Sequence, residues 1–181
     1  MPDGAVRHRR DMRTTTRPAV ALLVLALVGA APARAAGDYD WPLDPRPAVV
    51  RPFANPEKRW QPGHRGADLA AAPGQTVYAA GAGRVHHVGR VDDRVVVSVQ
   101  HPNGLLTTYE PLDEPAVREG DEVGTGTPLG RVAAGHEGCP AAACLHWGLR
   151  RGAGHAAEYF NPLLLVGAAP VRLLPDAGPS G

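Results

Sequence analysis

Residues 92–112 read DDRVVVSVQHPNGLLTTYEPL and predict a β-hairpin. From Val95 to Val99 every second residue is valine, which is the two-residue period of a strand with one buried face. The dipeptide Asn103-Gly104 follows and favours a two-residue type I′ turn. The stretch LLTTY then supplies a returning strand. We therefore expect an antiparallel pair of strands in this region.

The sequence on either side of this hairpin contains a faint internal repeat of glycines and valines. It consists of Gly74, Val77, Gly83 and Val85, echoed with one extra residue by Gly120, Val123, Gly130 and Val132. The chain has 22 glycines and 19 prolines but only 5% aromatic residues, a composition that favours short strands and turns. No sustained helical period occurs in 37–166. We predict an all-β fold, a small antiparallel β-sandwich or open barrel built from two Gly-punctuated hairpins.

Biotinyl and lipoyl carrier domains have a hybrid barrel with similar glycine-containing turns, so they are an alternative interpretation. Those carriers need a lysine at a hairpin tip to hold the attached cofactor. The only lysine in this chain is Lys58, which precedes the repeat. The position of that lysine excludes the carrier function, although a similar barrel remains compatible with the pattern.

The first 35 residues have the composition of a secretory signal peptide. Five arginines lie in 7–17, thirteen apolar residues follow in 19–31, and the tripeptide ARA ends at Ala35. About 13 apolar residues are too few to span roughly 30 Å of hydrocarbon, which disfavours a membrane anchor. We expect export, and translation can begin at Met1 or at Met12. The predicted organisation is a signal peptide (1–35), a lead-in (36–41), one domain (42–166) and a flexible tail (167–181).

Removal of the signal peptide changes the charge balance of the chain. The remaining residues include 13 basic and 16 acidic side chains, so the mature protein is slightly acidic. It has no basic patch with interleaved aromatic residues, which excludes nucleic acid as an expected partner.

Two separate stretches contain residues that favour metal binding. GHRGADLAAAPG (63–74) contains His64 and Asp68, four positions apart. In CLHWGLR (144–150) alternate residues form an apolar strand face, which leaves His146 on the opposite face. Two histidines and one aspartate, with one coordination position left for water, are the ligand set of an open catalytic zinc site.

The order of these motifs over 42–165 resembles the lysostaphin-type (LytM-like, β-lytic) zinc metallopeptidases. The shared order is H-x-x-x-D, a glycine-containing strand, the Asn-Gly hairpin, a second glycine-rich turn and the final H-x-H strand. The resemblance implies a LytM-like fold in which His64, Asp68 and His146 hold one zinc ion. It also implies a secreted, cell-wall-associated protein that acts on peptidoglycan or its peptide stems, with no membrane span after cleavage of the signal peptide.

The chain departs from that family at two catalytic positions. Family members carry a histidine in a Y-x-H-L element, where this chain has Pro111 within YEPL. They carry another as the first histidine of H-x-H, where this chain has Cys144. The resemblance implies that these histidines orient the attacking water and stabilise the oxyanion. Because a positioned acid or base contributes about 10²–10⁴-fold, we predict weak or absent turnover.

Few other residues are candidates to replace the missing histidines. His136, in the loop before the final strand, is the best substitute, and any residual rate is predicted to depend on it. Glu110 is predicted to point away from the site, because neighbouring strand residues face opposite sides. Trp60, in the loop before His64, is predicted to line the substrate groove. The remaining histidines of the mature chain are predicted to be surface or structural residues: His86, His87, His101 and His155.

The chain contains only two cysteines, Cys139 and Cys144. In an exported protein such a pair favours a disulfide, which would fix the loop that carries His136. The alternative is that Cys144 is a fourth zinc ligand, which would close the site and abolish hydrolysis.

Two classes of function therefore stand. One is a secreted zinc endopeptidase with an altered catalytic set. The other is a non-catalytic relative that binds the cell wall or regulates a partner and keeps the fold, with or without the zinc.

We predict that protein exported from its host begins near Ala36 and contains a Cys139–Cys144 disulfide. Intact mass spectrometry before and after reduction and alkylation should locate the start and label two thiols only after reduction. Detection of two free thiols in the exported, non-reduced protein would contradict the prediction.

Overall fold

The computed structural model describes residues 1, 38–56, 58, 60–135 and 138–169. The predicted signal peptide, apart from Met1, lies outside the described residues, as do His136 and the end of the predicted tail. The chain divides into two units, residues 1–34 and 35–181, and all elements below belong to the second unit.

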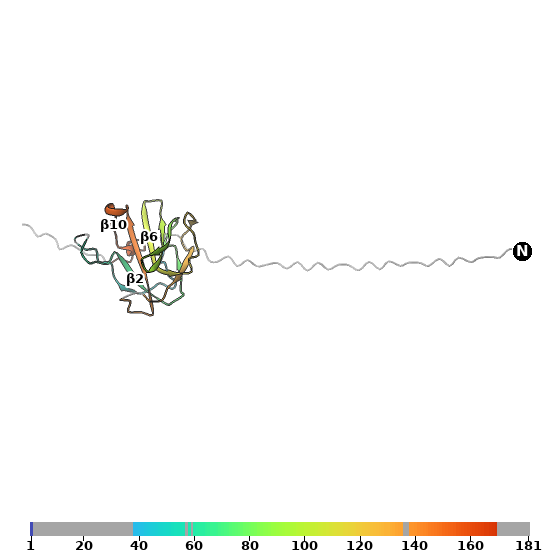
Figure 1. Cartoon of the computed structure of the whole chain (residues 1–181), viewed down its shortest axis with the longest axis horizontal. Helices are drawn as coiled ribbons and strands as arrows, with labels where there is room; N and C mark the ends of the chain where they lie inside the picture. The colour runs from blue at the N-terminus through green and yellow to red at the C-terminus, as the bar shows by residue number, and fades with distance from the viewer. Residues whose placement is uncertain (2–37, 57, 59, 136–137, 170–181) are drawn as a thin grey trace, which may run out of the picture. The chain divides into compact units, whose positions relative to one another are not determined.

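Across the described residues, ten strands form one sheet in which each neighbouring pair is antiparallel. The strands are β1 (Val49–Arg51), β2 (Gly66–Ala71), β3 (Thr76–Tyr78), β4 (Gly83–Val91), β5 (Arg94–Gln100), β6 (Leu105–Asp113), β7 (Glu122–Val123), β8 (Pro128–Val132), β9 (Ala143–Arg151) and β10 (Glu158–Tyr159). Their main order is β1-β2-β9-β6-β5-β4-β7. β10 pairs with β9, and β8 pairs with both β3 and β6. Figure 1 shows the orange β9 between β2 and β6.

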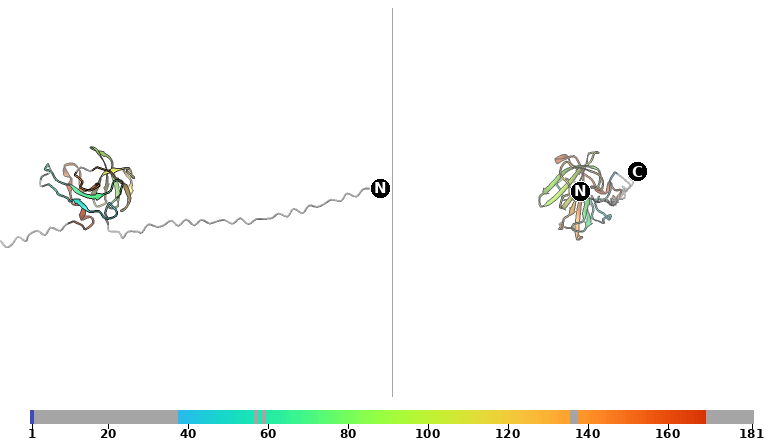
Figure 2. Two further views of the ribbon diagram at one scale, coloured as in Figure 1. Left: turned by 90° about the horizontal axis from the view of Figure 1, so that it is seen from below. Right: turned by 90° about the vertical axis from the view of Figure 1, so that its right-hand side faces the viewer.

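The all-β prediction is confirmed. Within the described residues the only helical elements are two short 3₁₀ turns, η1 (Gly154–Ala156) and η2 (Pro162–Leu164). The sheet curves strongly around its buried side chains without closing into a barrel (Figure 2). No helix in the described part of the chain is long and apolar enough to cross a membrane.

The β5–β6 hairpin is present, but the predicted type I′ turn is wrong. The backbone N–H of Gly104 donates to the carbonyl of His101 at 3.0 Å. The N–H of His101 donates to the carbonyl of Leu105 at 2.8 Å, so His101 and Leu105 are the last paired residues of the hairpin. The loop therefore has three residues, and among them only Gly104 has a positive φ, 80°. A type I′ turn needs positive φ at two central residues, whereas Pro102 fixes a negative φ at the start of a tight turn.

The internal repeat is real in the structure, but its two copies do not form separate hairpins. Val77 of the first copy pairs with Gly130 of the second, in β3 and β8. The equivalent residues Gly83 and Val123 pair in β4 and β7. Each copy thus pairs with the other, because the short strands bury their valines only when the copies interlock.

The packed core extends slightly beyond the domain limits expected from the sequence. Trp41 packs against the core, and Tyr39 forms a bridge with Gly81. At the other end Ala168 and Ala169 also pack against core residues. The predicted lead-in and tail therefore contribute some packing.

A buried hydrogen-bond chain crosses the sheet interior beside the hairpin. A single order of hydrogen-bond donors and acceptors satisfies every contact in the network. His101 donates from Nδ1 to the Ala82 carbonyl at 2.8 Å and accepts at Nε2 from the Thr107 hydroxyl at 2.9 Å. Thr107 Oγ1 then accepts from the Tyr109 hydroxyl at 2.9 Å. The Tyr109 oxygen accepts from the Ala80 N–H at 2.9 Å. His101 is thus a structural residue, as predicted.

Burial makes the two titratable side chains of this hydrogen-bond network, His101 and Tyr109, harder to ionise. It lowers the pKa of His101 below its ordinary value of 6.5, although the hydrogen bond to Ala82 opposes the shift. It raises the pKa of Tyr109 to about 12. The folded protein therefore favours neutral His101, whereas the unfolded chain takes up a proton there below pH 6.5.

We predict that His101 makes the protein less stable in acid. The contribution of neutral His101 to the free energy of unfolding is fully present above pH 6.5. It is lost as the pH falls through the lowered pKa of His101 in the folded state. The free energy of unfolding is measured by urea titration at about pH 7.5 and about pH 5. At the higher pH, His101→Gln should be less stable than the wild type by about 1–2 kcal/mol. Between the two pH values, His101→Gln should lose less stability than the wild type loses. His86, which is exposed on β4, provides the control substitution His86→Gln. An equal acid loss in the wild type and His101→Gln would exclude this role.

Candidate functional site

The register of β2 against β9 brings two candidate ligands together. Asp68 lies directly opposite His146, so both side chains are on the same face of the sheet. The alternate residues Leu145 and Trp147 are fully buried on the other face. The predicted alternation of this strand is therefore present. Asp68 is only 1% exposed.

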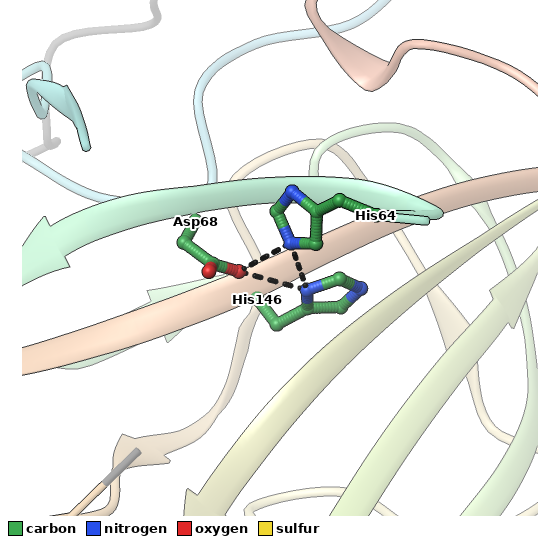
Figure 3. A group of neighbouring side chains, drawn as sticks. All are labelled: His64, Asp68 and His146. Atoms are coloured by element: carbon green, nitrogen blue, oxygen red, sulfur yellow. Dashed lines mark hydrogen bonds and ion pairs between the residues drawn. The ribbon is translucent and has the colours of Figure 1, made fainter. Parts of the chain in front are cut away.

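His64 reaches the same point from the segment just before β2. Its Nδ1 lies 2.8 Å from the carbonyl oxygen of Pro52, to which it donates a hydrogen bond. Its Nε2 lies 2.9 Å from Oδ1 of Asp68 and 3.1 Å from Nδ1 of His146. That Nδ1 lies 2.8 Å from the same carboxylate oxygen. Figure 3 shows the three atoms converging from different parts of the chain.

The chemistry of these atoms fits a bound cation. The bond to Pro52 assigns the proton of His64 to Nδ1, so that Nε2 presents a lone pair. The carboxylate of Asp68 can only accept. Ligands on a tetrahedral zinc ion with bonds of 2.0–2.1 Å lie about 3.3 Å apart, close to the observed spacings. A metal-bound histidine usually donates its other N–H to a carbonyl or carboxylate, as His64 does.

Gly66 provides the space for the His146 ring. A Cβ at Gly66 would lie 2.5 Å from Nε2 of His146 and 2.6 Å from the carbonyl oxygen of Trp147. The second contact is to strand backbone, which cannot yield without disturbing the β2–β9 pairing. The GHRGAD motif therefore supplies two candidate ligands, His64 and Asp68, and the room for the third, His146.

His64 and His146 lie on the wall of an open pocket of about 720 Å³. A pocket of this size is large enough for a small peptide segment. Charged side chains of both signs line it: Arg51, Arg90, Arg94, Asp93, Glu110 and Asp113. The candidate metal site is thus accessible to a polar ligand.

The predicted orientation of Glu110 is wrong. A bulge shifts the β5–β6 register so that Val97 pairs with Tyr109 but Val95 pairs with Leu112. Tyr109 and Leu112 both lie in the core, three positions apart. The two residues between them, Glu110 and Pro111, both line the pocket. The prediction assumed that Tyr109 and Pro111 both face the site. Tyr109 is instead buried, so Glu110 lies on the opposite face beside His146, and the bulge leaves Pro111 on the same side as Glu110.

The second altered position, Cys144, is fully buried and bonded to Cys139 with an S–S distance of 2.01 Å. The predicted disulfide is therefore present, and the alternative in which Cys144 is a zinc ligand is wrong. A disulfide sulfur also has no proton to transfer. Gly135 and Gly138 line the pocket, but His136 between them lies outside the described residues, so its role stays a prediction.

Trp60 is 82% exposed, with the ammonium group of Lys58 5.7 Å from its ring centre. It is not among the residues that line the pocket beside His64. Contact between Trp60 and a substrate stays a prediction.

Comparison with known proteins places this site in a family. The model of peptidase family M23 matches residues 62–162, which include His64, Asp68 and His146. The uncharacterized protein Rv2891 of Mycobacterium tuberculosis is 49% identical over 172 residues, which cover 94% of this chain and 69% of that protein.

Solved structures share the fold. A zinc-containing peptidase from Vibrio cholerae is 25% identical, with a TM-score of 0.53, over 62% of this chain and 36% of the other. A chain of the SpoIIQ–SpoIIIAH pore-forming complex is 22% identical, with a TM-score of 0.59, over 71% of this chain and 90% of the other. The family match covers more than half of the residues, including the three candidate ligands. The chain therefore belongs to peptidase family M23.

Proposed function

We propose that this chain is an exported zinc-dependent peptidase that hydrolyses peptides of peptidoglycan. The observation that carries the proposal is the convergence of Nε2 of His64, Oδ1 of Asp68 and Nδ1 of His146 at the wall of an open pocket. Membership of family M23 supports the substrate class, because relatives in this family act on peptidoglycan. The predicted signal peptide supports export.

The three candidate ligands have distinct roles. His64 presents a fixed lone pair because Pro52 holds its other nitrogen, and Asp68 contributes a buried negative charge. His146 completes the set from the strand next to the pocket. When bound, zinc polarises a peptide carbonyl and makes water a better nucleophile at neutral pH. Within the described residues these three form the candidate ligand set, so a bound zinc ion would keep a coordination position open for water or substrate.

The two altered positions reduce what the protein can add to the metal. Pro111 has no side-chain proton to exchange. Cys144 is held in the disulfide and is equally unable to act as an acid or base. We expect turnover below that of relatives that retain both histidines.

The same two positions favour a second candidate function, a non-catalytic module that binds wall peptides or a partner protein. A fold of this type occurs in the SpoIIQ–SpoIIIAH complex, a pore-forming assembly. A polar pocket with an intact ligand set is compatible with ligand binding alone. Measurement of turnover separates the two functions.

We predict that the purified protein binds about one equivalent of zinc and that zinc raises its melting temperature. His146→Ala should abolish both effects. Gly66→Ala retains every ligand but displaces the His146 ring, and it should weaken zinc binding by about 10–100-fold, as other losses of ligand orientation do.

The matched control for zinc binding is Gly124→Ala. Gly124 is exposed, and the nearest atom to an added Cβ is 3.9 Å away. This variant should bind zinc like the wild type in competition with a chelator. Unchanged zinc affinity in both His146→Ala and Gly66→Ala would refute the assigned ligands.

We further predict slow, zinc-dependent hydrolysis of purified cell walls, about 10²–10⁴-fold below that of a relative with both histidines. The measurement is the release of new amino groups by wild type and His64→Ala in matched amounts. His64→Ala should release none. A zinc-loaded wild type that binds walls without any release would favour the non-catalytic function instead.

A further inference from the structure

Four neighbouring strands carry a row of polar residues across the pocket face. Arg51 of β1 lies opposite Asp68 of β2, Asp68 lies opposite His146 of β9, and His146 lies opposite Glu110 of β6. Directly opposed residues share a face, with Cβ atoms about 4.5–5.5 Å apart. The Glu110 carboxylate is therefore on the same face as the candidate ligands, one strand beyond His146.

The surroundings of Glu110 direct it to the pocket rather than to bulk solvent. Its side chain is 20% exposed and lines the pocket together with His64 and His146. Nη1 of Arg94 lies 3.6 Å from its Oε1. A carboxylate has lone pairs on two oxygens, so the contact with Arg94 leaves Glu110 the capacity to accept a further hydrogen bond.

We propose that Glu110 is the catalytic proton-transfer residue of this chain and replaces the histidine that the family carries at the Pro111 position. The inference rests on the proposed peptidase function. A water oxygen forms a bond to the peptide carbonyl carbon, and Glu110 accepts the proton that the water loses. Glu110 then gives that proton to the departing amine nitrogen as the carbon–nitrogen bond breaks. One water is consumed, and the carboxylate is restored.

A purely structural role for Glu110 makes a different prediction. If Glu110 served only to pair with Arg94, removal of either partner would have the same effect. The substitution Arg94→Gln breaks this ion pair but keeps the carboxylate in the pocket. Asp113→Asn removes another pocket carboxylate from the same strand and provides a control for charge.

The test compares zinc-loaded wild type with Glu110→Gln, Glu110→Asp, Arg94→Gln, Asp113→Asn and His136→Ala in the cell-wall assay. Zinc content and melting temperature are measured for each. Glu110→Gln should keep its zinc and lose about 10²-fold or more in rate, with partial recovery in Glu110→Asp. Arg94→Gln and Asp113→Asn should lose less than about fivefold, the range of a surface ion pair, and under this proposal so should His136→Ala, in place of the dependence on His136 expected from the sequence. Equal losses in Glu110→Gln and Arg94→Gln, or a large loss only in His136→Ala, would overturn the proposal.

A binding measurement tests Glu110 even without turnover. Acetohydroxamate, a small chelator of zinc, gives up a proton as it binds, so an adjacent carboxylate should assist it. Glu110→Gln should bind acetohydroxamate about tenfold more weakly than wild type, whereas Asp113→Asn should not. If zinc-loaded wild type releases no amino groups, the proposed peptidase function fails, and this comparison decides on Glu110 separately. Equal affinities in wild type and Glu110→Gln would overturn the inference.

Discussion

The antiparallel pairing of β2 with β9 places Asp68 opposite His146, and the candidate site depends on this register. The register is fixed from the other face of the sheet, where Leu69, Leu145 and Trp147 are completely buried. A slip of β9 by one residue would expose Leu145 and Trp147 and turn His146 into the core, away from Asp68. Core packing and metal-site geometry are therefore determined by the same hydrogen-bonded ladder.

The third candidate ligand, His64, is held in position by residues at the edge of the sheet. His64 lies before β2, and the β1 segment holds it through the Pro52 carbonyl and through paired backbone hydrogen bonds with Ala54. The Pro52 contact fixes the ring and also determines which nitrogen faces the other ligands. Gly66 must leave room for the His146 ring. The short motif from His64 to Asp68 therefore contains two candidate ligands and, at Gly66, the space for the third. The residues that follow the edge strand β1 thus help to position His64.

Of the two positions expected to differ from the family, Pro111 lines the pocket, whereas Cys144 is fully buried. Pro111 and Glu110 lie together at the β6 bulge, and Cys144 is held by its disulfide on the adjoining strand. Neither Pro111 nor the disulfide-bonded Cys144 offers an acid–base group, whereas the regular pairing of β6 with β9 places Glu110 opposite His146 on the pocket face. Under the proposed function, catalysis therefore depends on which acid–base groups lie beside the candidate ligands as well as on those ligands.

The sequence by itself determined the all-β fold, the central hairpin, the alternation of the final strand, the cysteine pair and the ligand candidates. These depend on short-range patterns: period, turn residues and spacing. The type of turn also had a local signal, Pro102, but the interlocking of the repeat and the direction of Glu110 were decided only by the tertiary structure. Each depends on which strand pairs with which, and in what register, and a bulge changes that pairing without any mark in the local pattern. The side of the sheet that a residue faces is a property of two strands together, so one strand's sequence could not supply it.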